Sequence, residues 1–159
     1  MKRPQKGFSL IELLIVVAII LIIAAIAIPN LLRARMQANE ASAASSIHAI
    51  NTAEISYSTA FSGIGYSVAL ADLGDGGTSP CPGTATASCY LDTSLASGTK
   101  SGYNFTYTQD STSTPSLHYT VLADPVSRGN SGQRSFYSSD ANLTRYNTVA
   151  TASSTDSPL

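Results

Sequence analysis

The sequence predicts an α+β fold, with one long N-terminal helix followed by a small antiparallel sheet of about four strands. An apolar run covers residues 8–28 and contains only two polar residues, Ser9 and Glu12. The Ala-rich segment between Asn30 and Phe61 has no Gly or Pro, so the helix is expected to continue through it. The last third of the chain alternates apolar and polar residues, which is typical of strands. With 159 residues the chain is long enough for about one domain.

The apolar run has the length and the flanking charges of a membrane-spanning helix. Its 21 residues, at about 1.5 Å per residue, cover roughly the 30 Å of a bilayer core. Lys2, Arg3 and Lys6 precede it and are expected to stay on the cytoplasmic side. Charged residues make up 12% of the chain and form no basic patch, so no nucleic-acid partner is predicted.

Three interpretations of the run compete. A secretory signal peptide would suit the small-residue pattern Ala25-Ile26-Ala27, but the run is longer than a usual signal sequence and contains Glu12. A plain membrane anchor explains length and orientation and leaves Glu12 without a role. A carboxylate in a membrane-spanning helix is costly, and such residues are usually functional.

The third interpretation rests on a resemblance. A basic leader, Gly7, and then Phe8-Ser9-Leu10-Ile11-Glu12 before a long apolar helix resembles the type IV pilin and pseudopilin family and its class III prepilin signal. The resemblance implies that a prepilin peptidase removes the leader, residues 1–7, by cutting between Gly7 and Phe8, and methylates the new amino group of Phe8. Glu12 then falls at the fifth residue of the mature chain, where the family carries its acid. Pro29 stands where many members have a proline, whereas the glycine common in the middle of the family's run is missing.

The resemblance also implies partners and locations. The expected partners are copies of the chain in a helical filament, the prepilin peptidase, the inner membrane before assembly and the pilus assembly machinery. Glu12 of one copy is expected to meet the Phe8 amine of a neighbour and to set the axial register. The precursor belongs in the bacterial inner membrane, and the mature subunit belongs in an extracellular pilus or a periplasmic pseudopilus. No enzymatic activity, catalytic residue, metal or cofactor is predicted.

The helix is expected to divide at Pro29, which lacks a backbone donor and clashes with the preceding turn, so a kink is predicted there. The part at 8–29 is the predicted transmembrane and filament-core helix, and 30–61 is its amphipathic continuation. Apolar residues recur at three- and four-residue steps: Ala43, Ile47, Ile50, Ala53 and Tyr57. Four polar residues are expected to fall largely off that stripe: Glu40, Ser46, Asn51 and Glu54.

Residues 62–147 are predicted to form the globular domain. Ser62-Gly63-Ile64-Gly65 ends the helix, and a Gly/Ser/Thr/Pro-rich loop follows at 74–87. Cys81 and Cys89 are the only cysteines and are expected to form a disulfide on the translocated side. Strands are predicted at 103–108, 117–124, 134–138 and 143–146, and the Thr/Ser-rich tail at 148–159 is expected to bury little and stay flexible. The acids at Asp72 and Asp75 fit no EF-hand spacing.

These features predict a structural subunit of a type IV pilus-like filament. The nearest alternative is a pseudopilin of a type II secretion system, which shares the N-terminal module. An alternative from another class is a membrane-anchored periplasmic binding domain that does not polymerise. N-terminal sequencing separates this last alternative from the other two, and electron microscopy of surface fibres separates a pilus from a pseudopilus.

Overall fold

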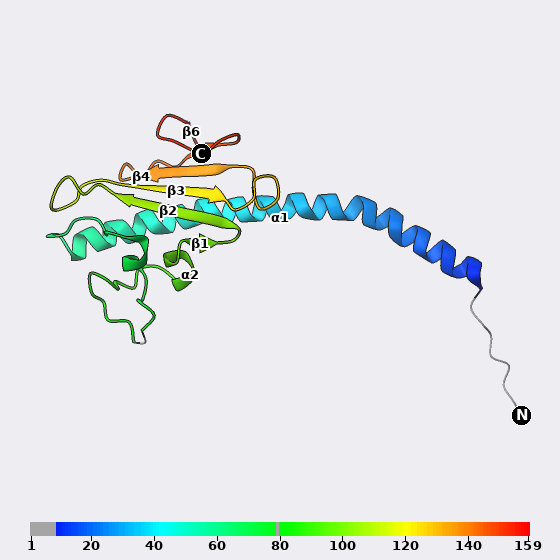
Figure 1. Cartoon of the computed structure of the whole chain (residues 1–159), viewed down its shortest axis with the longest axis horizontal. Coiled ribbons are helices and arrows are strands. Elements are labelled where there is room, and N and C mark those ends of the chain that lie inside the picture. The colour runs from blue at the N-terminus through cyan, green and yellow to red at the C-terminus, as the bar shows by residue number, and fades with distance from the viewer. Residues whose placement is uncertain (1–8, 79) are drawn as a thin grey trace, which may run out of the picture. The chain divides into compact units, whose positions relative to one another are not determined.

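The computed structural model describes residues 9–78 and 80–159 and confirms the α+β class (Figure 1). One helix, α1 (Leu10–Ala60), is 51 residues long and is followed by a six-stranded sheet. The chain divides into two compact units, Met1–Arg35 and Met36–Leu159, which we describe separately.

In the first unit, α1 begins at Leu10 and runs through Pro29 without interruption. A proline inside a helix supplies no N–H, so the carbonyl of Ala25 loses its usual intrahelical partner. The predicted kink at Pro29 stays a prediction. The expected helix start at Phe8 lies outside the described residues.

In the second unit, the six strands follow one another in sequence order, and every neighbouring pair is antiparallel. The strands are β1 (Thr99–Lys100), β2 (Tyr103–Gln109), β3 (Tyr119–Pro125), β4 (Ser135–Ser139), β5 (Arg145–Asn147) and β6 (Ser157–Pro158). The predicted count of about four was too low. The two unpredicted strands, β1 and β6, have two residues each, which is too short for an alternating pattern to be recognised.

Residues 36–60 of α1 pack along this sheet, and the predicted apolar stripe is confirmed. Ala43, Ile47, Ile50, Ala53 and Tyr57 are all buried. They share one core with sheet residues Tyr103, Phe105, Tyr119, Val121, Ala123 and Phe136. Figure 1 shows this part of α1 running beside the strands. Burial of this apolar surface is the main source of the unit's stability.

The four polar residues that were expected off the stripe are buried as well, so that prediction was wrong. Glu40, Ser46, Asn51 and Glu54 are all less than 10% exposed. The spacing explains two of them, because Glu40 and Glu54 lie seven residues before and after Ile47 and so share its face. The face that meets the sheet is therefore a mixed apolar and polar surface.

The helix ends at Ala60, two residues before the glycine-containing segment 62–65 that was predicted to stop it. The amides of Ile64 and Gly65 both donate to the Phe61 carbonyl, which closes the final turn. Gly65 has φ +84°, and a Cβ there would overlap the Ser116 backbone. Glycine is required because the left-handed conformation and the close approach of the chain both exclude a side chain.

A loop region with two short helices, η1 (Leu70–Leu73) and α2 (Thr93–Ala96), lies between α1 and the sheet in sequence. The predicted disulfide is present and joins Cys81 to Cys89, with the Cα atoms 6.3 Å apart. It closes a small ring in the Gly-rich segment, which has little apolar surface of its own to hold it.

The C-terminal tail differs from the expectation that it buries little. Ala152 is buried, and Ser157–Pro158 pairs with β5 as the edge strand β6. The Asp156 carboxylate accepts hydrogen bonds from the Ser153 amide and the Asn147 side chain. Polar side chains thus attach a segment whose composition alone predicts no packing.

Candidate assembly site

The first half of α1 exposes a continuous apolar surface. Every Leu, Ile and Val from Leu10 to Ile28 is between 46% and 77% exposed. The helix is long and apolar enough to cross a membrane by length and composition. Soluble monomers rarely expose apolar patches of this extent, so the surface is one that a bilayer or other protein chains would cover.

Glu12 is the one charged residue in this apolar segment and lies in the first turn of α1. Its Oε2 accepts a hydrogen bond from the backbone amide of Ser9 at 3.0 Å. A carboxylate in the first turn also interacts favourably with the helix dipole. Gly7 and Phe8 lie outside the described residues, so the cut, the methylation and the pairing of Glu12 with the Phe8 amine stay predictions.

Three polar anchors, built on Glu40, Asn51 and Glu54, attach the second half of α1 to the rest of its unit. In the first, Glu40 Oε1 accepts from the backbone amides of Gln133 and Arg134 at 2.7 and 3.1 Å. Its Oε2 accepts from Arg134 Nε at 2.7 Å, which completes an ion pair. Burial raises the pKa of the Glu40 carboxyl, but these hydrogen bonds and the Arg134 charge outweigh it and hold the pKa below its ordinary value.

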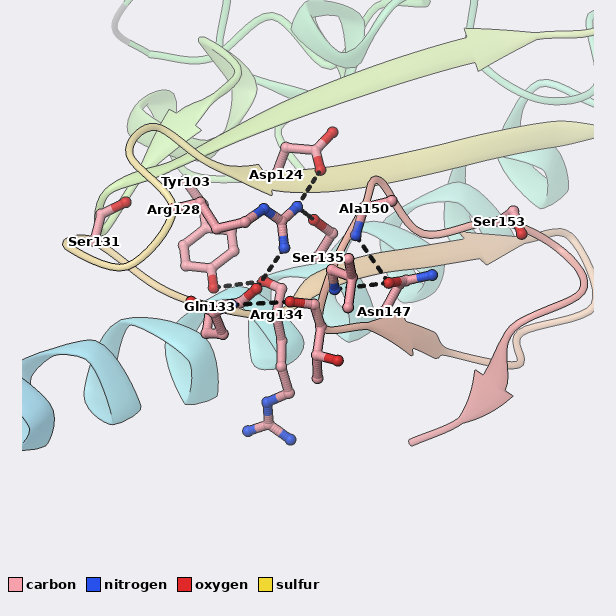
Figure 2. Close-up of polar contacts among 12 residues, drawn as sticks. Tyr103, Asp124, Arg128, Ser131, Gln133, Arg134, Ser135, Asn147, Ala150 and Ser153 are labelled. Atoms are coloured by element: carbon pink, nitrogen blue, oxygen red, sulfur yellow. Dashed lines mark hydrogen bonds and ion pairs between the residues drawn. The ribbon is translucent and has the colours of Figure 1, made fainter.

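The loop that meets Glu40 is itself held by an arginine (Figure 2). Arg128 donates to the Gln133 carbonyl at 2.5 Å and to Ser135 Oγ at 2.6 Å. The Tyr103 hydroxyl, from β2, donates to the Arg134 carbonyl at 2.7 Å. These bonds orient the loop so that its two amides face Glu40, which leaves neither the carboxylate nor the amides unpaired.

The second anchor is Asn51, in the middle of the helix–sheet contact. Its Nδ2 donates to Ser138 Oγ on β4 at 2.9 Å, and its Oδ1 accepts from the Tyr119 hydroxyl on β3 at 3.0 Å. Both partners are buried. A buried amide of this kind must find both a donor and an acceptor, so it fixes the position of the helix along the sheet.

The third anchor is Glu54, which is fully buried. Its Oε2 accepts from the backbone amide of Ser67 at 3.0 Å, and its Oε1 accepts from the Ser67 hydroxyl. The Tyr107 hydroxyl on β2 donates to the Ser67 carbonyl at 3.0 Å. Burial raises the pKa of the Glu54 carboxyl despite these hydrogen bonds. The anchor ties the segment after α1 back onto the helix.

The three anchors join the second half of α1 to the sheet and to the segment that follows the helix. In residues 9–78 and 80–159 there is no group of three or more His, Cys, Asp or Glu side chains that could hold a metal ion. Asp75, one of the acids in the Gly-rich loop, accepts from Gly77 and Thr93 instead. The three anchors were not predicted, although the heptad spacing of Glu40, Ile47 and Glu54 was a signal for two of them.

Comparisons with known proteins agree with the resemblance seen in the sequence. Residues 2–28 match the family model described as the prokaryotic N-terminal methylation motif. The chain is 68% identical over 38 residues to the type IV wide pilus major component PilA4 of Thermus thermophilus, covering 24% of this chain and 29% of PilA4. It is 48% identical over 53 residues to the type IV major pilin protein PilA of Myxococcus xanthus, covering 33% of this chain and 24% of that protein.

The matched regions are short. They span less than a third of the length of either relative. No solved structure matches the chain significantly. The predicted resemblance is nevertheless confirmed over these regions, because residues 2–28 match the N-terminal methylation motif and both relatives are type IV pilins.

Proposed function

We propose that the chain is a structural subunit of a type IV pilus-like filament. It is made as a precursor anchored in the inner membrane, cut between Gly7 and Phe8, methylated at Phe8 and polymerised through α1. Residues 1–7 are the leader, and residues 8–29 form first the membrane span and then the filament core. The mature subunit functions outside the inner membrane and has no catalytic role.

The observation that carries the proposal is the uncovered apolar helix with one carboxylate near its start. A membrane anchor needs only the apolar residues, whereas a filament of identical helices also needs something that sets their axial positions. Glu12 supplies this in the proposal, because a carboxylate away from water is strongly favoured when it meets a cation. The cut removes Lys2, Arg3 and Lys6 and creates a cationic amine at Phe8, about 6 Å along the helix from Glu12.

The mass of the mature protein tests the processing step. The full chain, produced together with a prepilin peptidase, is expected to lose residues 1–7 and to gain one methyl group on Phe8. A matched control, Gly7→Leu, places a bulky side chain at the cut and is expected to keep its leader. A wild-type chain that keeps Met1 would contradict pilin processing and favour the membrane-anchored alternative. A chain that begins at Ile28 would also contradict pilin processing and would favour a cleaved secretory signal peptide.

Electron microscopy tests polymerisation and separates the two filament types. Cells carrying the chain with its assembly machinery are expected to show surface fibres that an antibody against the sheet unit labels along their length. The two relatives are named as major pilus subunits, which favours this outcome over a pseudopilus. Processed subunits that form no surface fibre and remain in the periplasm would favour the pseudopilin alternative instead.

A further inference from the structure

The first part of α1 carries three ionisable side chains that the proposed role leaves partly unused. Between Leu10 and Asn39 these are Glu12, Arg33 and Arg35. All three are exposed. None of them forms an ion pair with another residue that the structure describes. Glu12 and Arg33 are 21 residues apart, which is about 32 Å along a helix.

We propose that in the filament Glu12 of one copy pairs with Arg33 of a second, parallel copy displaced by 21 residues along the helix axis. This inference rests on the proposed function, since it requires that the chain polymerises through α1. The surface is the exposed side of α1 around each charge, and its partner is a second copy of this chain.

The sequence around the two charges supports this displacement. A shift of 21 residues places Leu10, Ile11 and Ile15 of one copy at the same axial levels as Leu31, Leu32 and Met36 of the other. All of these except Met36 are exposed in the single chain, and Met36 is partly exposed. Of these, Ile15 and Met36 lie three residues after Glu12 and Arg33 and so share their helix faces. An apolar pair therefore lies beside the charged pair, which reduces its contact with water and strengthens the attraction.

Other arrangements of two copies are less favourable. Unshifted parallel copies place Glu12 beside Glu12 and Arg33 beside Arg33, and like charges at close range repel. Antiparallel copies would need opposite insertion in the membrane, which the basic residues before the apolar run oppose. A shift of 23 residues would pair Glu12 with Arg35 and place Arg33 at the level of Leu10, whereas a shift of 21 residues places Arg35 at the level of Leu14. The effects of Arg33→Gln and Arg35→Gln on filament yield distinguish these two shifts.

The pairing is compatible with the expected contact between Glu12 and the Phe8 amine. That contact needs a shift of only four residues, so it involves a different neighbour in a helical array. A carboxylate has about four acceptor positions on its two oxygens. One of these is used by the Ser9 amide, and the others remain for the amine and for Arg33.

Substitutions of the two arginines test whether the positive charge of Arg33 pairs with Glu12. Residues two apart do not share a helix face, so Arg35 is the matched control for Arg33. Arg33→Gln is expected to lower filament yield roughly tenfold, because it leaves Glu12 without a cation in that contact. Arg33→Lys is expected to restore most of the yield, and Arg35→Gln is expected to change it little. Equal losses for Arg33→Gln and Arg35→Gln would overturn the proposal and favour arginine contacts with lipid headgroups.

Disulfide trapping tests the displacement directly. Cys81 and Cys89 are already joined, so the double variant Ile15→Cys/Met36→Cys has two new thiols and no other free cysteine among its described residues. Copper-catalysed oxidation by oxygen removes one hydrogen from each thiol and is expected to give a ladder of linked copies from intact filaments. Ile15→Cys/Ile26→Cys, with an 11-residue separation, is the control for random linkage.

Different results would overturn the 21-residue displacement and the role as a pilin subunit. Filaments of Ile15→Cys/Met36→Cys that give no more linkage than the control would overturn the 21-residue displacement and leave the pilin role intact. Wild-type chains that are processed and form no filament of any kind would overturn the proposed function itself.

Discussion

The two halves of α1 treat polar side chains in opposite ways. In the first half, Glu12 has one hydrogen bond, from the neighbouring Ser9, and is surrounded by exposed apolar residues. In the second half, Glu40 and Glu54 are buried, and partners outside the helix bind both oxygens of each carboxylate. The second half finds its polar partners within the chain, whereas the first half exposes an apolar surface that a bilayer or other chains would cover.

The difference shows how one helix can serve two purposes. Buried carboxylates require partners at defined positions, so Glu40 and Glu54 fix how the helix lies on its own sheet. Glu12 is exposed instead and accepts the Ser9 amide, so its other oxygen stays available to a second molecule. Buried carboxylates thus specify the fold, and the exposed one is free to act in the proposed assembly.

The largest expected effect is on assembly. Glu12→Gln is expected to reduce filament yield by roughly a hundredfold or more, because it leaves the Phe8 amine and Arg33 of neighbouring copies without a counter-charge. The thermal unfolding of the sheet unit in detergent micelles is expected to stay unchanged. Filament yield by electron microscopy and unfolding by circular dichroism measure the two quantities. Normal filaments from processed Glu12→Gln subunits would show that Glu12 does not set the register.

The second largest expected effect is on the stability of the fold. Substituting one buried and one exposed isoleucine of α1 separates this effect from the effect on assembly. Ile47 is fully buried, whereas Ile20 is 58% exposed. Ile47→Ala is expected to lower the free energy of unfolding by about 2–5 kcal/mol, from lost burial and the cavity left behind. Ile20→Ala is expected to leave it unchanged and to affect only membrane insertion or assembly. Equal losses in micelles would show that the two halves of α1 unfold as one unit.

Sequence reasoning succeeded where the pattern was long and failed where long-range partners decide the outcome. The apolar stripe from Ala43 to Tyr57 and the strand alternation at Tyr103 and Phe105 were predicted, because both repeat over several turns or residues. The burial of Glu40 was not, since it depends on the amides of Gln133 and Arg134, more than ninety residues away.

The packing of the C-terminal tail was missed for the same reason. Its Ser and Thr content predicts little burial, but Asp156 collects hydrogen bonds from Ser153 and Asn147, and Ser157 pairs with β5. Composition does not report which polar groups meet one another. The N-terminal methylation motif, in contrast, is local, so residues 2–28 were enough to predict the resemblance to type IV pilins without knowledge of the fold.

A smaller effect is expected from removing one anchor. Glu54→Ala leaves the Ser67 amide and hydroxyl buried without their acceptor, which costs about 1–3 kcal/mol of the free energy of unfolding. Filaments that still form should keep their register, because Glu12 is untouched. Urea unfolding of the full chain in micelles measures the loss, with Ser58→Ala on the exposed side of α1 as the control. A loss no greater than that of the control would show that the anchor adds no stability.

The smallest effect is a pH dependence that differs between the two acidic anchors. The pKa of Glu54 is raised above its ordinary value of 4.5, so the folded state holds its proton more tightly than the unfolded state. This contribution to stability is full below pH 4.5 and declines as pH rises through the folded pKa, by at most about 1.4 kcal/mol per pH unit. The pKa of Glu40 is lowered, so its contribution is full above its ordinary value of 4.5 and is lost as pH falls through the folded pKa.

Matched amide variants separate these two contributions. Glu54→Gln is expected to flatten the decline in stability as pH rises above 4.5, whereas Glu40→Gln is expected to flatten the loss below that value. Unfolding of both variants and the wild type, followed from pH 3 to pH 8, measures the slopes. The Tyr107 hydroxyl and the Asp72 charge also shift the pKa of Glu54, so Glu54→Gln removes their effects together with the effect of burial. Identical slopes for Glu54→Gln and wild type would show that Glu54 titrates alike in the folded and unfolded chain, and would remove the electrostatic contrast between the two anchors.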